Sequence, residues 1–217
     1  VKMVKNLIVS IFLMIFAALP VFCADVLPKY TTNLHTKTYG FYQVGKFIQL
    51  HEEADENSKI IQTISWTQDK LMPEGLKYDD VFSVFIGSKE LALMAVEDET
   101  EDWVKLIYDN KNNKSGWMKK DDPYKFMTWV NLYNSYGRKY GFKILKDAPE
   151  AVLSLHADTE DNSQVVAQLN HPEFIKLNVI KGNWALVTVV DLDRTPKTGY
   201  IRWRSDDGVK YLFPAIK

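Results

Sequence analysis

The chain contains an internal repeat. Residues 50–61, LHEEADENSKII, recur as residues 155–166, LHADTEDNSQVV, at an offset of 105. Of the twelve aligned positions, four are identical and five more exchange one acid for another or isoleucine for valine. Two copies indicate a duplicated domain and not an array of many units. Further matches follow in the same order in both halves: Asp102-Trp103 and Asn183-Trp184, Ser115-Gly116-Trp117-Met118 and Thr198-Gly199-Tyr200-Ile201, Asp121-Asp122 and Asp206-Asp207.

Both copies consist of short runs rich in β-branched and aromatic residues, separated by polar turns. This pattern is typical of an all-β barrel or sandwich. The expected strands are residues 47–50, 59–64, 81–86, 91–96 and 103–108 in the first copy, and 152–155, 165–169, 174–180, 184–190 and 199–203 in the second.

The repeat also sets the expected boundaries. The first copy spans residues 41–123 and the second spans 142–217, with a helical linker at 124–141. A helix is predicted in the linker because its apolar residues recur near helical spacing. The linker residues at this spacing are Phe126, Trp129, Val130, Tyr133 and Tyr140.

The first copy is longer than the second by an insertion at about residues 65–89.

The N-terminal stretch is predicted to lie outside both copies. Lys2 and Lys5 precede an apolar run, which is typical of a secretory signal covering residues 1–23. The alternative is a permanent membrane anchor, although the run is short for a span of about 20 residues. Residues 24–40 are polar and are expected to form a linker or an N-terminal arm. If Cys23 leaves with the signal, the secreted protein has no cysteine and hence no disulfide or thiol nucleophile.

Charge and motifs restrict the classes of function. The chain has a net charge of −1 and no long basic run, so nucleic acid is not the expected partner. Neither a Gly-x-Ser-x-Gly nucleophile elbow nor a His-Glu-x-x-His zinc motif is present, and we predict a protein that is not an enzyme and needs no cofactor. A pair of carboxylates for glycoside hydrolysis is a spatial feature that a sequence does not reveal. The acidic segments 52–56 and 158–161 offer carboxylates of the kind that calcium binds, but they lack EF-hand spacing and are expected to be solvated loops without a metal.

Each half resembles a bacterial SH3 (SH3b) domain. The resemblance rests on Asn57-Ser58-Lys59-Ile60-Ile61, on Trp103-Val104-Lys105-Leu106 and on Gly116-Trp117-Met118, with their counterparts in the second half. It covers residues 42–124 and 144–213 apart from the insertion, but the Arg, Gly and Pro usual after the first strand are missing. The resemblance implies two tandem SH3-like barrels, placement in the cell envelope or outside the cell, and binding of cell-wall peptides or proteins. A fold alone does not specify a ligand.

Aromatic and histidine side chains are the candidate binding residues. His51 and His156 occupy the same place in both copies, as ligand contacts or as strand-end residues that pack on the barrel. Tyr and Trp are enriched at binding faces because one end is apolar and the other polar. The remaining candidates are Trp103, Trp117, Trp184 and Tyr200 in the repeated positions, and Trp66 and Phe82 in the insertion. We expect these aromatic side chains to face a partner or, as the alternative, to pack in the core and close the barrel.

These observations predict a secreted or periplasmic, non-enzymatic binding protein. Its partner would be a cell-wall peptide or an envelope protein, with no contact to the membrane once the signal is removed. The alternative is an accessory subunit that docks on an envelope complex through the insertion. Since the insertion makes the copies different, we expect them not to share one ligand.

Overall fold

The computed structural model describes residues 29–30, 33–120, 126–170, 172, 174–191 and 193–216. The signal expected at residues 1–23, and its alternative as an anchor, therefore lie outside the described residues. Within the described part, the helices are all too short or too polar to cross a bilayer.

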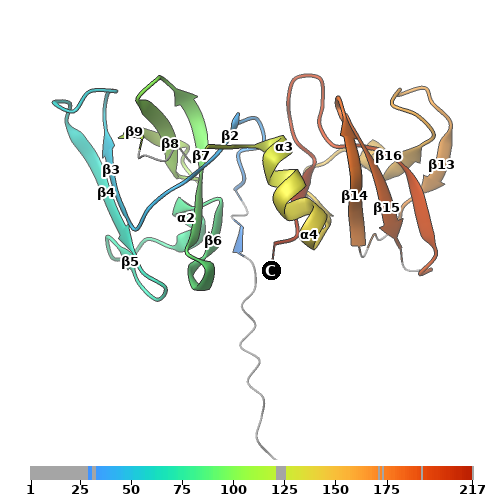
Figure 1. The fold of residues 1–217 in the computed structure, drawn as a ribbon, viewed down its shortest axis with the longest axis horizontal. Coiled ribbons are helices and arrows are strands. Elements are labelled where there is room, and N and C mark those ends of the chain that lie inside the picture. The colour runs from blue at the N-terminus through green and yellow to red at the C-terminus, as the bar shows by residue number, and fades with distance from the viewer. Residues whose placement is uncertain are drawn as a thin grey trace, which may run out of the picture.

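The strands form two antiparallel sheets, one from each copy, and the expected β-rich fold is confirmed. The sheets lie on either side of a central helical segment (Figure 1). The first sheet contains β1 (Lys29–Tyr30), β2 (Gly40–Gln43), β3 (Phe47–His51), β4 (Ile60–Trp66), β5 (Leu71–Met72), β6 (Val84–Ile86), β7 (Leu91–Glu99), β8 (Trp103–Asp109), β9 (Lys114–Lys119) and β10 (Phe126–Thr128). The second contains β11 (Phe142–Ile144), β12 (Ser154–His156), β13 (Val165–Gln168), β14 (Phe174–Lys181), β15 (Trp184–Val190), β16 (Pro196–Arg202) and β17 (Leu212–Pro214).

The duplication extends to the strand order. The second sheet runs β13-β12-β16-β15-β14-β11-β17. In the first sheet, the corresponding strands pair in the same order, β4-β3-β9-β8-β7-β2-β10, and β1, β5 and β6 are additions. Neither sheet closes into a barrel within the described residues, because strands such as β13 and β17 pair on one side only. The expectation of closed barrels is corrected to two open, antiparallel sheets.

The two copies also share an irregularity at one point of the sheet. The β3–β4 and β12–β13 pairs both shift register at the histidine, by a β-bulge next to His51 and His156. Beside it, the strand from the end of each copy comes very close. A Cβ atom on Gly116 would lie 2.9 Å from the Ile61 side chain, and one on Gly199 would lie 2.9 Å from Leu155. Only glycine fits at these two positions, which explains their place in the repeat.

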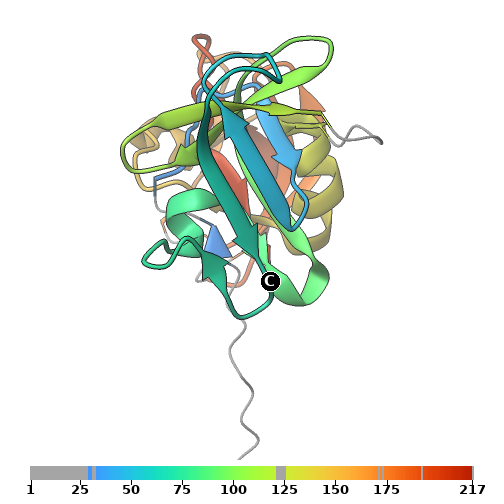
Figure 2. The same ribbon diagram turned by 90° about the vertical axis from the view of Figure 1, so that its left-hand side faces the viewer.

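The insertion of the first copy is part of the hydrophobic core. It adds β5, β6, helix α2 (Tyr78–Val81) and the 3-10 turn η1 (Gly87–Lys89), which lie at one end of the first sheet (Figure 2). In the second copy, β15 pairs along the whole of β14, whereas β8 pairs only with the end of β7, and β6 pairs with its start. The insertion therefore supplies a partner for the part of β7 that β8 does not pair with.

Trp66 and Phe82 are buried, with exposed fractions of 3% and 0%. Their rings pack edge to face at 6.2 Å, and the Trp66 indole donates a hydrogen bond to the Gly45 carbonyl. The expectation that these side chains face a partner is therefore corrected. The physical reason is that β6 and α2 extend the first copy's core, and that core needs large apolar side chains to fill it.

The helical linker joins the cores of the two copies. It comprises α3 (Trp129–Leu132), the π-type turn η2 (Tyr133–Gly137) and α4 (Arg138–Tyr140). The helix expected over residues 124–141 is corrected at its start, because Phe126 lies in strand β10, which pairs with β2. The Thr128 side chain caps α3 by accepting a hydrogen bond from the Asn131 amide. Trp129 and Tyr133, one helical turn apart, are buried in a cluster with residues of both sheets, whereas Val130 is exposed. The linker is therefore a packed junction.

The N-terminal arm is fixed to both copies. The Thr38 carbonyl accepts hydrogen bonds from the Trp129 indole at 2.9 Å and from the buried Lys210 side chain at 2.8 Å. On the other side, the His35 ring contacts the Asn110 carbonyl of the first copy at 3.1 Å. The described part of the segment expected as a linker at 24–40 thus crosses the junction as an ordered strap.

Candidate binding site

Each copy builds the same corner around its histidine. His51 ends β3 and lies opposite Trp117, and His156 ends β12 and lies opposite Tyr200. The Nδ1 atom of His51 is 3.1 Å from the Ser58 carbonyl, and that of His156 is 3.2 Å from the Ser163 carbonyl. Because a carbonyl only accepts, Nδ1 carries the proton in both rings.

The serine of the Asn-Ser motif shapes the acidic loop beside the histidine. The Ser58 hydroxyl accepts a hydrogen bond from the Glu53 amide at 2.9 Å, and the Ser163 hydroxyl accepts one from the Asp158 amide at 2.8 Å. These loops are exposed. The repeated Asn-Ser sequence therefore fixes the geometry of an exposed acidic loop.

A tryptophan completes the inner side of each corner. Trp103 begins β8 and Trp184 begins β15. The His51 and Trp103 rings meet edge to face at 5.3 Å, and the His156 and Trp184 rings do so at 5.1 Å. Both indoles are almost covered, at 8% and 7% exposure, so a ligand can reach only their rims.

The outer side of each corner is an ion pair that sequence reasoning missed. Lys119 ends β9 and pairs with Glu56, and Arg202 ends β16 and pairs with Asp161 at 2.5 Å. Glu56 and Asp161 are separated by the same offset of 105 as the histidines. The pKa of each base is raised, chiefly by the hydrogen bond to its acid. We call the four groups of one copy (histidine, tryptophan, base and acid) the histidine corner.

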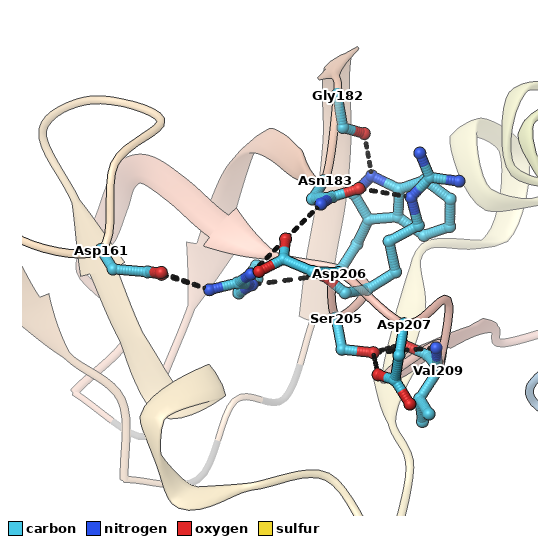
Figure 3. Close-up of polar contacts among 10 residues, drawn as sticks. Asp161, Gly182, Asn183, Ser205, Asp206, Asp207 and Val209 are labelled. Atoms are coloured by element: carbon cyan, nitrogen blue, oxygen red, sulfur yellow. Dashed lines mark hydrogen bonds and ion pairs between the residues drawn. The ribbon is translucent and has the colours of Figure 1, made fainter.

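The ion pair of the second copy belongs to a larger network of polar contacts (Figure 3). Besides Asp161, the Arg202 guanidinium binds Asp206 at 2.8 Å, and its carbon lies 5.8 Å from the centre of the Trp184 ring. Asp206 also accepts from the Asn183 amide, and the Asn183 oxygen accepts from Arg204. The turn after β16 is thereby tied to the β14–β15 hairpin.

A pocket of about 600 Å³ opens at this corner. One wall comes from the 3-10 turn η3 (Glu150–Leu153), through Pro149, Ala151 and Val152. Residues 145–153 connect β11 to β12 here, whereas only residues 44–46 connect β2 to β3 in the first copy. The wall is therefore an addition of the second copy. The rest of the lining is His156, Asp161, Trp184, Arg202, Ser205, Asp206, Asp207 and Tyr211.

A second hollow adjoins the pocket. It has a volume of about 580 Å³ and shares Asp161, Trp184, Arg202 and Asp206 with the first. Lys181 lines this hollow, and its ammonium lies 5.9 Å from the centre of the Tyr200 ring. The two hollows therefore meet at the ion pairs of Arg202 and together form an extended concave surface.

The predicted site residues fall into three groups. His156, Trp184 and Tyr200 lie at or next to the concave surface. His51, Trp103 and Trp117 form the corresponding arrangement in the first copy, which has the shorter connection and lacks the wall. Trp66 and Phe82 belong to the core and to neither corner. In the part of the chain that the structure describes, three or more His, Cys, Asp or Glu side chains do not gather into a metal-binding group.

No protein-family model matches the chain, and a search of curated proteins returns no match.

Proposed function

We propose that this protein is a non-enzymatic binding protein of the bacterial cell envelope, built from two SH3-like units. Its ligand, a cell-wall peptide, lies in the pocket of the second unit. The single observation that carries the proposal is the pocket itself, where an added wall turns a corner common to both units into a concave site. Concave surfaces with an apolar floor and a few placed polar groups are the usual form of ligand sites.

The polar groups of the pocket favour binding because they are already held in place. Arg202, Asp206 and Asn183 bind one another, and the Ser205 hydroxyl donates to Asp207 at 2.5 Å and accepts from the Val209 amide. A site whose side chains are fixed before the ligand arrives loses little entropy on binding. The rim of Trp184 adds an apolar contact of the kind that dominates binding energy in interfaces.

Placement in the envelope is supported by the sequence. The signal-like residues 1–23 and the resemblance of both halves to SH3b domains point to the same compartment. Docking through the insertion receives less support, because its largest apolar side chains are buried in the first copy's core.

A pair of matched variants tests the proposal. Ala151 is exposed and lines the pocket, and Lys46 is the residue at the same offset of 105 in the first copy. We expect Ala151→Phe to fill the pocket and to abolish capture of the protein on purified sacculi, with Lys46→Phe as an unaffected control. Equal capture of both variants would refute the pocket. Capture by purified envelope proteins and not by sacculi would refute a cell-wall ligand.

A further inference from the structure

We propose that the pocket of the second copy recognises a protonated amine or guanidinium group carried on an apolar stem, as in a basic peptide side chain. This inference rests on the proposed function, since it assumes that the pocket holds a ligand, and it adds the chemical class of that ligand. Four observations carry it: the internal bonds of Arg202, the bond that His156 makes through Nδ1, the spare acceptors of the acids, and the apolar residues in the same lining.

The positive group of the pocket is already used within the protein. The Arg202 guanidinium donates from one terminal nitrogen to Asp161 at 2.5 Å and from the other to Asp206 at 2.8 Å. Its Nε donates to the Arg204 carbonyl at 3.3 Å. A guanidinium has five N–H donors and no acceptor. Arg202 donates four hydrogen bonds to other groups of the protein. Arg202 therefore has little capacity left for an anionic ligand.

The histidine has one ring nitrogen left for a ligand. The Nδ1–H of His156 is committed to the Ser163 carbonyl, so Nε2 is the nitrogen that accepts a hydrogen bond when the ring is neutral. His156 lines the same pocket as Asp161 and Asp206. We infer that Nε2 adds one acceptor to those of the acids.

The acids keep spare acceptor capacity. Asp206 receives both of its bonds on Oδ1, from Arg202 and from Asn183, and among the described residues no donor contacts its Oδ2. Its side chain is 83% exposed. Asp161, Asp206 and Asp207 line the pocket against the single guanidinium of Arg202, although Lys37 neutralises Asp207 from outside the lining. The pocket thus has a surplus of negative charge and of hydrogen-bond acceptors.

Apolar side chains lie beside these acceptors in the lining of the pocket. Pro149, Ala151 and Val152 of the pocket wall, together with the rim of Trp184, line the same pocket as the acids. Long basic side chains bury their methylene groups on such a surface and leave the charged end at a polar group. The combination of an apolar wall with neighbouring acceptors fits a lysine-like or arginine-like group better than an acid or a neutral chain.

The test uses three tripeptides that differ only in the central side chain, Ala-Lys-Ala, Ala-norleucine-Ala and Ala-Glu-Ala, all acetylated and amidated. Each is titrated into the full folded chain, and the indole N–H signal of Trp184 is followed by NMR. We expect Ala-Lys-Ala to bind at least tenfold more tightly than the other two. Asp206→Asn, an exposed and nearly isosteric change, should weaken the lysine peptide about tenfold, whereas Glu56→Gln in the first copy should have no effect.

The outcomes separate this inference from the proposed function. Similar shifts of Trp184 with all three peptides, or a preference for Ala-Glu-Ala, would overturn recognition of a cation while leaving a peptide pocket in place. An Asp206→Asn variant that binds the lysine peptide as well as the parent would also overturn it. If none of the peptides moved the Trp184 signal while sacculi still captured the protein through the Ala151-sensitive pocket, the inference would fail and the proposed function would stand.

Discussion

The two copies of the repeat build the same corner from equivalent residues and then add to it in opposite ways. The first copy adds a long insertion, which becomes strands β5 and β6 and helix α2 and fills the core with Trp66 and Phe82. The second adds a few residues before β12, which stay at the surface as the wall of a pocket. The size of an addition therefore says little about its role, and the smaller one creates the candidate site.

The largest expected effect on stability comes from a substitution in the core of the first copy. Trp66→Ala removes a buried indole and its hydrogen bond to Gly45, and we expect a loss of about 3–5 kcal/mol in the free energy of unfolding. Denaturant unfolding measures this loss. If Trp66→Ala left stability unchanged and reduced ligand capture, the insertion would be a binding element after all.

The second prediction tests whether the corners are truly equivalent. Gly116→Ala and Gly199→Ala place a methyl group within about 3 Å of the neighbouring strand in both copies. We expect each to destabilise the protein by about 1–3 kcal/mol, with similar values for the two. Thermal unfolding of both variants gives the comparison, and a large effect in one copy alone would show that only that copy depends on close strand contact.

The third prediction concerns the junction that the second copy makes with the arm. Burial, and then the charge of Arg204, lower the pKa of Lys210 from 10.5 to about 8. Between these values the unfolded chain binds more protons than the folded one, so stability should rise as pH increases from 8 towards 10.5. Lys210→Met should flatten this rise, while Thr38 keeps its bond from Trp129.

Unfolding of the parent and of Lys210→Met at pH 7.5, 8.5 and 9.5 checks that prediction. Because other groups titrate in both proteins, the difference between the two curves isolates Lys210. A constant difference across the three pH values would contradict the lowered pKa of Lys210.

The smallest expected effect concerns the ion pairs of the corners. Arg202→Gln removes the partner of Asp161 and Asp206. It should lower the free energy of unfolding by no more than about 1 kcal/mol, because these acids are exposed. Lys119→Gln removes a more exposed base from one acid and should cost less. Double-mutant cycles with Asp161→Asn and Glu56→Gln measure the coupling energy of each ion pair. We expect the larger coupling energy in the second copy, and a larger one in the first copy would contradict this prediction.

The repeat made the common framework predictable. Residues aligned by the constant offset, such as His51 and His156, proved equivalent in register and in hydrogen bonding. The helix at the junction was also predictable, because Trp129 and Tyr133 lie one turn apart and only one face is buried.

The differences between the copies were harder to predict. A large aromatic residue in an insertion suits a core as well as a partner surface. The sequence alone does not say whether Trp66 and Phe82 face the core or the solvent. The pocket wall lies before the gap-free repeat, so the alignment did not reveal the longer connection at residues 145–153. The pair of Arg202 and Asp161 could have been found from the sequence. Asp161 and Glu56 share the offset of 105, and a basic residue, Arg202 or Lys119, stands three positions after the glycine of each Gly-aromatic motif.

One measurement tests the central claim, that the second corner binds and the first does not. Trp103 and Trp184 occupy equivalent places, so their indole N–H signals report on both corners in one sample. In a titration with solubilised cell-wall fragments, we predict that the Trp184 signal shifts and saturates while the Trp103 signal stays in place. A shift of Trp103 alone, or of both signals with the same affinity, would contradict the account.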